Sequence, residues 1–388
     1  MAQQVKGGRR HALAYRVARA LVTPYFVRRF NFHTGAEPDI AGPFLLVINH
    51  VTELDFMLAG AAFSAPLAFV VGDTLLTAPV VGWLLRVLFG MIPKNKGIAD
   101  AGTAMGILRR LRGGQNVCLF PEGNTCFDGR TGPFPQGTGS LARAVGVPLV
   151  TYRISGAYLA LPRWGRGIRT GRTCGQVAGV YPPDKLKAMT PGEINALIAR
   201  DLSVDAYADQ MASPVAYRGK KRAEGLEHAL YLCPGCGEIG SLAARDDAVT
   251  CSACGLRAVL DEYGAFEGGK PHPHIQAWTD SQRAWLHKRV LAAQGAPVLE
   301  DQDQTLYERG EGRQLLPAAR GKLVMDAQEL AVGEKRFALS ELTSLEIYRK
   351  NILLLAASDG KRYQLHSKKP FNALKYRDMF NILKAERR

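Results

Sequence analysis

The sequence predicts an α/β domain over residues 41–222, with a mostly parallel sheet flanked by helices, and two smaller modules after it. Three observations support this architecture: apolar runs alternate with helical patterns, two Cys-x2-Cys pairs follow, and short strand patterns fill the C-terminal part. The apolar runs lie at 44–48, 68–71, 117–120, 148–154 and 176–180, and the helical patterns at 53–63, 79–89, 98–112, 137–145 and 192–211.

The composition is typical of a folded protein with an acidic partner. The chain has 388 residues, of which 47% are hydrophobic, so two or three domains with a sizeable core are expected. Its net charge of +15 implies binding to nucleic acid or to an anionic membrane surface. Composition does not decide between the two.

Residues 1–40 favour the membrane. The first thirty positions contain no acidic residue and these cations: Lys6, Arg9, Arg10, Arg16, Arg19, Arg28 and Arg29. Apolar residues lie between them, so we expect a basic amphipathic helix, or two helices broken at Pro24, that lies in an anionic membrane surface. The alternative is a helix whose apolar face packs on the rest of the domain.

No signal-peptide pattern follows these charges, and no run reaches the roughly 20 apolar residues that a spanning helix needs. The apolar helical patterns between residues 56 and 92 are either core helices or helices inserted shallowly in a membrane. We therefore expect a peripheral or monotopic protein.

The segment from Asn49 to Asp55 carries the first chemical signal. His50 follows the apolar run that ends at Ile48, and Thr52 begins a helical pattern. Asp55, about one turn into that helix, can reach the imidazole, fix its tautomer and stabilise the imidazolium, which would make His50 a general base. The alternative is a capping box, in which Asp55 caps a backbone donor.

A second signal follows the apolar run at 117–120, where the chain reads Phe120-Pro121-Glu122-Gly123. Ligands of parallel sheets collect at the carboxyl ends of the strands. Because His50 and Glu122 both follow expected strands, the two residues can face one cleft.

Several segments, in this order, resemble the glycerolipid acyltransferase family, which includes 1-acylglycerol-3-phosphate acyltransferase. The resemblance covers roughly residues 20–215 and implies the glycerolipid acyltransferase fold for the parallel-sheet domain. The matching segments are Asn49-His50-x4-Asp55, Asp73-x-Leu75 with Pro79-x-x-Gly82, Gly90-Met91-Ile92-Pro93-Lys94-Asn95-Lys96, Phe120-Pro121-Glu122-Gly123 and Val147-Pro148-Leu149-Val150.

The chain departs from the family in three motifs, and in the fourth of the family's motifs Thr151 stands where a second proline is common. After Phe-Pro-Glu-Gly the family usually has a threonine and a basic residue, whereas this chain has Asn124 and Thr125, with its nearest cation at Arg130. In the second motif the family usually has an arginine where Lys96 aligns, and a lysine offers a point charge in place of a bidentate fork.

The resemblance implies transfer of a fatty acyl group from acyl-CoA or acyl carrier protein to the free hydroxyl of a lysophospholipid. The favoured acceptor is 1-acylglycerol-3-phosphate, which would give phosphatidate, with His50 as general base oriented by Asp55. The candidate substrate-binding residues are Asn49, Lys94, Lys96, Glu122, Gly123 and Arg130. Among them the cations would hold the acceptor phosphate. The alternatives are solvated lysines, an ordinary strand-end glutamate and a turn-forming asparagine.

Two other functions are left open. One is acyl transfer to another lysophospholipid in phospholipid remodelling, and the other is a catalytically inactive protein that binds membrane or nucleic acid. The presence of His50, Asp55 and Glu122 argues against the second, so nucleic acid is not the partner we expect.

Residues 223–268 contain two Cys-x2-Cys pairs, the ligand arrangement of a structural zinc ribbon: Cys233, Cys236, Cys251 and Cys254. Four thiolates leave no open coordination position, so the zinc would hold the fold and would not catalyse. Iron and a pair of disulfides are the alternatives. The other cysteines, Cys118, Cys126 and Cys174, form an odd set, which favours a reducing compartment and hence the cytoplasmic face of the membrane.

Residues 269–312 are expected to form a helical linker, with a helix at 281–293. Residues 313–388 show short strand patterns, turn signals such as Asp359-Gly360, and a final helix at 370–384. This pattern resembles a pleckstrin-homology-like domain, an antiparallel β-barrel with one helix. Its basic residues either face anionic lipid head groups or form a solvated surface.

Overall fold

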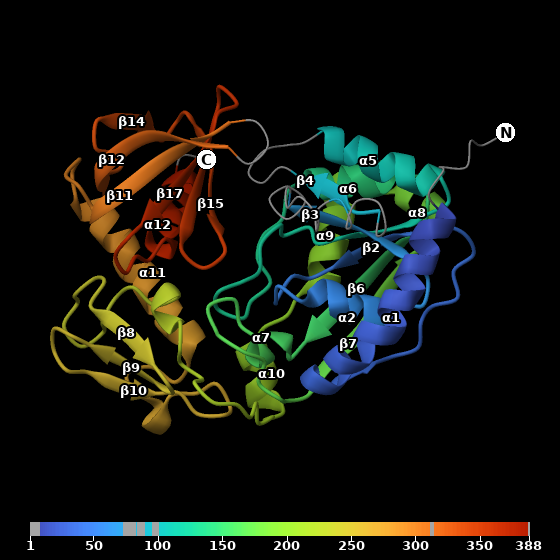
Figure 1. The fold of residues 1–388 in the computed structure, drawn as a ribbon, viewed down its shortest axis with the longest axis horizontal. Helices are drawn as coiled ribbons and strands as arrows, with labels where there is room; N and C mark the ends of the chain where they lie inside the picture. Colours follow the sequence, from blue (N-terminus) through green and yellow to red (C-terminus); the bar gives the residue numbers. More distant parts are fainter. Residues whose placement is uncertain (1–7, 73–82, 84–89, 95–100, 311–313, 387–388) are drawn as a thin grey trace. The chain divides into compact units, whose positions relative to one another are not determined.

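The chain divides into two compact units in a computed structural model that describes residues 8–72, 83, 90–94, 101–310 and 314–386 (Figure 1). The first unit comprises Met1–Arg163 and Gly167–Gly219, and the second comprises Trp164–Arg166 and Lys220–Arg388. The two Cys-x2-Cys pairs and the C-terminal strands thus belong to the same unit.

The first unit is built on a seven-stranded sheet with the strand order β1-β7-β6-β2-β5-β3-β4. Within this sheet only β6 and β7 pair antiparallel, so the expectation of a mostly parallel sheet is confirmed. The strands are β1 (Phe32–Thr34), β2 (Leu45–Ile48), β3 (Leu67–Gly72), β4 (Ile92–Lys94), β5 (Asn116–Leu119), β6 (Leu149–Ser155) and β7 (Thr173–Tyr181).

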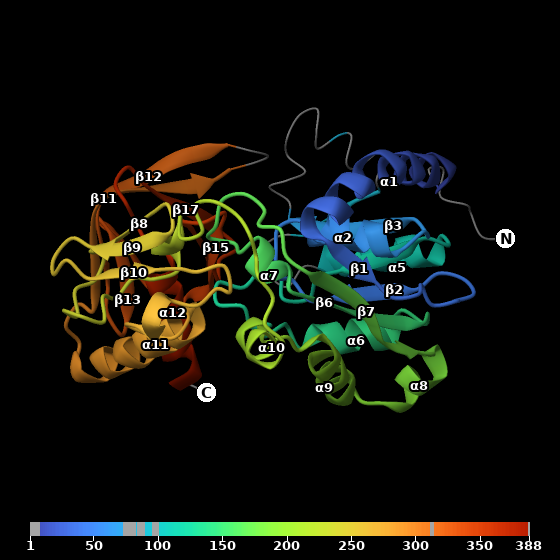
Figure 2. The ribbon, with the colours of Figure 1, turned by 90° about the horizontal axis from the view of Figure 1, so that it is seen from below.

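Helices cover both faces of this sheet, as Figure 2 shows for α1 and α2 on one side and α6, α8 and α9 on the other. The helices are α1 (Gly8–Phe30), α2 (Asp55–Ala62), α5 (Ala101–Arg112), α6 (Gly137–Ala144), α7 (Ala157–Ala160), α8 (Pro183–Ala188), α9 (Pro191–Leu202) and α10 (Ala206–Ala212). A core of fully buried side chains joins alternate residues of β2, such as Leu45 and Val47, to α5, α6 and α9. The buried runs of the central strands follow from this double coverage.

Some expected boundaries are wrong. The helical pattern at 192–211 forms two helices, because Asp205 accepts hydrogen bonds from the N–H groups of Tyr207 and Ala208 and caps a new helix. The helical pattern at 79–89 and the family segment at 73–82 lie almost entirely outside the described residues. The short strands β1 and β4 were not expected, because three-residue strands carry too little alternation to detect.

Helix α1 is continuous through Pro24 and is docked on the unit by its polar side chains. Tyr15 donates a hydrogen bond to the carbonyl of Phe63 over 3.0 Å, and Arg19 donates to the carbonyls of Gly60 and Ala61, near the C-terminus of α2. Apolar side chains spaced four residues apart point away from these contacts and are exposed: Leu13, Val17, Leu21 and Tyr25. The helix therefore presents an apolar stripe that the described residues do not cover. Among the described helices, none has the length and apolar composition for crossing a bilayer.

The second unit contains a three-stranded sheet of order β10-β9-β8 and a seven-stranded antiparallel sheet of order β14-β13-β12-β11-β17-β16-β15. The small sheet consists of β8 (Leu242–Arg245), β9 (Ala248–Cys251) and β10 (Arg257–Val259), and is followed by α11 (Ile275–Ala292). The large sheet consists of β11 (Leu299–Arg309), β12 (Leu315–Met325), β13 (Glu329–Val332), β14 (Lys335–Ala338), β15 (Leu342–Tyr348), β16 (Ile352–Ala357) and β17 (Arg362–Ser367), and is followed by α12 (Leu374–Glu386). The antiparallel strands and the C-terminal helix are as expected, whereas closure into a pleckstrin-homology-like barrel stays a prediction.

The expected helical linker at 269–312 is too long at its C-terminal end, and the helix expected at 281–293 begins earlier than predicted. Helix α11 begins at Ile275, and β11 begins at Leu299. Strand β11 was not expected from the sequence, because its buried positions do not form an apolar pattern. One of them, between Leu299 and Leu306, is the polar residue Gln304.

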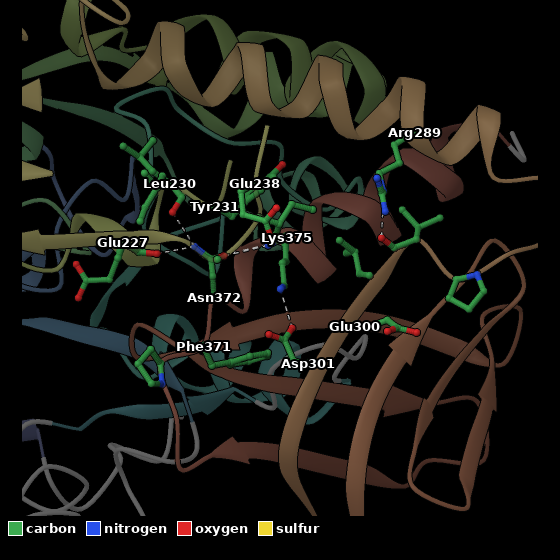
Figure 3. Close-up of a pocket in the computed structure, with 17 residues that line it drawn as sticks. Glu227, Leu230, Tyr231, Glu238, Arg289, Glu300, Asp301, Phe371, Asn372 and Lys375 are labelled. Carbon is green, nitrogen blue, oxygen red and sulfur yellow. Dashed lines mark hydrogen bonds and ion pairs between the residues drawn. The ribbon is translucent and has the colours of Figure 1, made fainter. Parts of the chain in front are cut away.

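A cavity of about 610 Å³ lies inside the second unit, and Figure 3 shows its lining. Its polar side chains pair with one another: Lys375 is 3% exposed and lies 2.7 Å from Asp301, and Asn372 donates to the carbonyls of Glu227 and Leu230. These contacts join the cysteine-bearing segment, the large sheet and the start of α12. They account for the clustering of these elements into one unit.

Candidate active site

His50 lies just beyond the carboxyl end of β2, and its imidazole contacts a buried carboxylate. His50 Nδ1 is 2.9 Å from Oδ2 of Asp55, and the same oxygen accepts the N–H groups of Val51 over 2.7 Å and Thr52 over 3.0 Å. Asp55 therefore both contacts the imidazole of His50 and caps backbone N–H groups, so the two interpretations of this residue are compatible. Asp55 is fully buried, whereas the His50 side chain is 21% exposed and can be reached from solvent.

Asp55 is the first residue of α2, so the expectation that it lies one turn into the helix is wrong. The segment from Val51 to Leu54 is a non-helical turn. The N–H groups of Val51 and Thr52 donate to the Asp55 carboxylate, which stabilises this turn. At the first turn of a helix a negative charge is stabilised by the helix dipole.

The electrostatics of Asp55 combine opposing effects. Burial raises the pKa of this carboxyl, while hydrogen bonds and the charge interaction with His50, and the N–H groups of Thr52 and Val51, lower it. Its other oxygen, Oδ1, is buried and has no hydrogen-bond partner among the described residues. When Asp55 is ionised, its carboxylate can only accept, and a neutral His50 then carries its hydrogen on Nδ1 and keeps its lone pair on Nε2.

Glu122 joins two loops by accepting backbone hydrogen bonds. The Oε1 atom accepts the N–H of His50 over 2.7 Å, and the Oε2 atom accepts the N–H of Gly132 over 2.7 Å. The register of β2 with β5, in which Val47 lies opposite Leu119, brings Glu122 to His50. Both oxygens are engaged with main chain, so the geometry gives Glu122 a positioning role and does not support direct contact with substrate.

Asn49 was expected to bind substrate, and the structure shows its side chain engaged with main chain. Its side chain is fully buried, its Nδ2 donates to the carbonyl of Ile154 over 2.9 Å, and its Oδ1 accepts the N–H of Ile154 over 2.8 Å. The amide group thus extends the pairing of β2 with β6 by one residue. It holds the chain directly before His50 in place.

The structure describes two of the three candidate phosphate contacts, Lys94 and Arg130. Lys94, at the end of β4, lies beside the Phe-Pro-Glu-Gly turn: a Cβ on Gly123, whose φ is +71°, would be 3.5 Å from Lys94 Nζ. Arg130 forms an ion pair with Asp205 over 3.4 Å, in which both side chains are partly exposed. Lys96 lies outside the described residues. Lys94 is therefore the cation that the structure brings to the turn.

Sequence reasoning missed one side chain that touches His50. The ring of Phe120 stacks on the imidazole with a centroid distance of 4.7 Å and an interplanar angle of 28°. The position of Phe120, directly before Pro121 and Glu122, is evident from the sequence, but the direction of its ring is not. An apolar residue at a strand end is as compatible with the core as with the site.

The four cysteines of the second unit form a cluster that could hold a metal ion. All four Sγ atoms lie within 4.8 Å of one another. Two of the separations are 3.7 Å, from Cys233 to Cys254, and 3.8 Å, from Cys236 to Cys251. Zinc–sulfur bonds of about 2.3 Å in a tetrahedron place sulfurs about 3.8 Å apart, so the donor set and the spacing fit zinc.

Comparisons with known proteins find similarity to acyltransferases, and the family-model match lies within the first unit. Residues 29–155 match the family model described as Acyltransferase. Over 135 residues the chain is 29% identical to 1-acyl-sn-glycerol-3-phosphate acyltransferase BAT2, chloroplastic, of Brassica napus, covering 34% of this chain and 38% of that relative. Over 138 residues it is 28% identical to 1-acyl-sn-glycerol-3-phosphate acyltransferase LPAT1, chloroplastic, of Arabidopsis thaliana, covering 34% and 37%. The chain thus matches less than half of the length of these relatives.

Among solved structures, the chain is similar to the 1-acyl-sn-glycerophosphate acyltransferase PlsC of Thermotoga maritima. The sequence identity is 20% and the TM-score is 0.41, over 51% of this chain and 82% of that one.

The burial of Glu122 generates a prediction about pH. Burial raises the pKa of its carboxyl to about 8, although the N–H groups of His50 and Gly132 favour the ionised form. Between about pH 4.5 and 8 the folded protein then holds a proton that the unfolded chain has lost, so the contribution of Glu122 to stability falls as pH rises. We expect the stability difference between wild type and Glu122→Gln to change with pH by up to about 1.4 kcal/mol per unit in this range.

Denaturant unfolding of both proteins at several pH values measures this difference. Glu53→Gln is the matched control, because Glu53 is exposed beside the same site. A difference between wild type and Glu122→Gln that stays constant from about pH 5 to 8 would contradict the prediction.

Proposed function

We propose that the first unit transfers a fatty acyl group from an acyl thioester to the free hydroxyl of a lysophospholipid. The observation that carries the proposal is the 2.9 Å contact between His50 and Asp55 at the carboxyl end of β2, next to the Phe-Pro-Glu-Gly turn. The favoured acceptor is 1-acylglycerol-3-phosphate, the substrate class in the names of both plant relatives, and the product is then phosphatidate. The acyl donor is acyl-CoA or acyl carrier protein.

The proposed reaction needs no covalent enzyme intermediate. Nε2 of His50 takes the proton of the acceptor hydroxyl while the hydroxyl oxygen attacks the thioester carbonyl carbon. The carbon–sulfur bond then breaks, and the leaving thiolate takes the proton from the imidazolium, so His50 returns to its starting state. Asp55 keeps the hydrogen on Nδ1 and stabilises the transient positive charge.

An apolar cavity beside this site suits an acyl chain. It has a volume of about 180 Å³ and lies between α1 and α2, the helix that begins with Asp55. Its lining is almost wholly apolar and includes Val22, Phe56, Met57, Phe69 and Met91. A hydrocarbon chain gains free energy from leaving water for such a surface.

Acceptor choice depends on the phosphate contacts. Lys94, beside Gly123, is the proposed contact for the acceptor phosphate. Arg130 is engaged with Asp205, and the basic residue that the family usually has after Phe-Pro-Glu-Gly is missing. Among the described residues, few cations are assigned to the turn, which favours a second candidate function, acyl transfer to another lysophospholipid.

The exposed stripe of α1 is the proposed membrane contact. Leu13, Val17, Leu21 and Tyr25 would insert among the acyl chains, while the exposed Arg16 and Arg28 would meet anionic head groups. The enzyme would thereby lie on the membrane that holds its acceptor. The cytoplasmic side remains the expected one.

The second unit is proposed to contain a structural zinc ion held by Cys233, Cys236, Cys251 and Cys254. A closed set of four thiolates gives zinc no position for a substrate, so its contribution is to the stability of the ribbon. The ribbon and the C-terminal sheet are proposed as docking modules of the enzyme.

The base assignment predicts the effect of removing the imidazole. His50→Ala should lower turnover by at least about a hundredfold, because general base catalysis is typically worth about 10²- to 10⁴-fold. Thiol release from acyl-CoA with 1-acylglycerol-3-phosphate measures turnover, and circular dichroism checks the fold. His33→Ala, at an exposed histidine of β1, is the matched control. A folded His50→Ala variant with normal turnover would exclude His50 as the base.

The phosphate contact predicts a selective change in KM. Lys94→Ala should raise the KM for 1-acylglycerol-3-phosphate by about tenfold or more, because a charge-assisted hydrogen bond is worth about 1.5–3 kcal/mol. The KM for an uncharged acceptor, monoacylglycerol, should change little. Lys187→Ala, at an exposed lysine of α8, is the control, and Lys96→Ala in the same assay tests the second lysine. Equal changes for both acceptors would rule out the phosphate role of Lys94.

The membrane contact predicts weaker vesicle binding for Leu21→Glu. Leu21 is 76% exposed, so the substitution leaves the packing of the unit intact, and a charge at this place should lower binding to phosphatidylglycerol vesicles by at least roughly tenfold. Vesicle co-sedimentation measures the binding. Met211→Glu, at a 72% exposed residue of α10, is the control. Unchanged binding of Leu21→Glu would remove α1 from the membrane contact.

The metal site predicts about one zinc ion per chain by elemental analysis. Cys251→Ser should lose the ion and lower the unfolding temperature of the protein, since the ion binds the folded ribbon and not the unfolded chain. Cys174→Ser, at a cysteine of β7 outside the cluster, should keep it. Purified protein that contains iron in place of zinc would support the alternative metal.

A further inference from the structure

We propose that Phe120 is a positioning residue for His50: it fixes the plane of the imidazole by stacking and stabilises the imidazolium that forms during acyl transfer. This inference rests on the proposed function of the first unit. It assigns to the Phe-Pro-Glu-Gly turn a role in controlling the base, besides any role in binding the acceptor.

The placement of Phe120 follows from the sheet. Strand β5 ends at Leu119, and its parallel register with β2 puts Phe120 beside the residues that lead to His50. Successive side chains of a strand point to opposite faces. Leu119 enters the core with α5, α6 and α9, whereas Phe120 meets the imidazole at 4.7 Å and 28°. Phe120 is 8% exposed, so its ring is held by its surroundings.

Stacking supplies a constraint that Asp55 cannot supply alone. The hydrogen bond from Nδ1 to Asp55 fixes one atom of the ring, and the bond from Glu122 to the His50 N–H fixes the main chain. The ring can still tilt about the line between these points, because the last torsion of a histidine side chain has a broad energy well. A flat aromatic surface against one face of the imidazole restricts that tilt and keeps Nε2 in one direction.

The stacked ring also acts on charge. The face of an aromatic ring attracts a cation within about 6 Å, and the imidazolium lies within that limit. His50 carries this charge only after it has taken the hydroxyl proton. Phe120 therefore stabilises the charged state more than the resting state, which is the condition under which a contact accelerates a reaction.

The test compares full-length wild type with Phe120→Leu and Phe120→Tyr in the thiol-release assay with acyl-CoA and 1-acylglycerol-3-phosphate, over a range of pH. Phe44→Leu is the matched control. Phe44 is 5% exposed, so it loses the same ring from a similar environment, but it precedes β2 and is at the opposite end of that strand from His50.

For Phe120→Leu we expect kcat to fall roughly two- to twelvefold, the factor that corresponds to an aromatic pair of about 0.5–1.5 kcal/mol, with little change in KM. The acid limb of the kcat/KM profile should move to lower pH by about half a unit, because the imidazolium loses its aromatic face. Phe120→Tyr should keep kcat and the position of the acid limb close to those of wild type. Phe44→Leu should lower the unfolding temperature and leave the acid limb in place.

A second measurement does not depend on activity. In NMR spectra of the protein, the ring protons of His50 should show an upfield ring-current shift that is present in wild type and Phe120→Tyr and absent in Phe120→Leu. If Phe120→Leu does not fold, pentafluorophenylalanine at position 120 keeps the ring shape and reverses the charge of its face. It should then lower kcat and move the acid limb in the same direction.

The outcomes separate this inference from the proposed function. An active wild type whose kcat and acid limb are the same in Phe120→Leu would overturn the role of Phe120 and leave the function standing. A wild type without thiol release would overturn the function, and the NMR shift would then decide whether the stacking exists. Absence of that shift in the wild-type protein would overturn the stacking itself.

Discussion

The candidate active site depends on one carboxylate oxygen. Oδ2 of Asp55 accepts the imidazole of His50 and the N–H groups of Val51 and Thr52, all within 3.0 Å. These three donors turn the chain between β2 and α2 and aim the imidazole in the same step. Because Asp55 is fully buried, these donors are also what keeps its charge tolerable inside the protein. The local fold and the proposed chemistry thus rest on a single side chain.

A second carboxylate connects this turn to the rest of the sheet. Glu122 binds the N–H of His50 with one oxygen and the N–H of Gly132 with the other, so the end of β2 and the long loop after β5 are fixed to each other. Asn49 does the same toward β6 through Ile154. The main chain at His50 is therefore fixed by contacts among β2, β5 and β6. In this arrangement the motif glutamate and asparagine act on the backbone, while Asp55 and Phe120 act on the imidazole ring.

The exposed apolar side chains of α1 are compatible with binding to a membrane surface. The polar atoms of Tyr15 and Arg19 are used for docking on the region around α2, and the apolar side chains are exposed. A soluble surface helix has the reverse arrangement. The apolar cavity between α1 and α2 lies in the same region, so the proposed membrane contact, the proposed acyl-chain cavity and His50 belong to adjacent elements of one unit.

The sequence by itself determined the parallel-sheet domain, the pairing of His50 with Asp55 and the four-cysteine cluster, because strand periodicity and contacts over a few residues are local properties of a chain. It did not determine where α2 begins, that β11 is a strand with a buried glutamine, or which partners Asn49 and Glu122 would find. The partners of Asn49 and Glu122 are about 70 to 105 positions away along the chain, and only the packing of β2 against β5 and β6 brings them together. Strand β11 likewise depends on its pairing with β12 and β17. The direction of the Phe120 ring was decided in the same way, since a strand end permits either face until the neighbouring strand is in place.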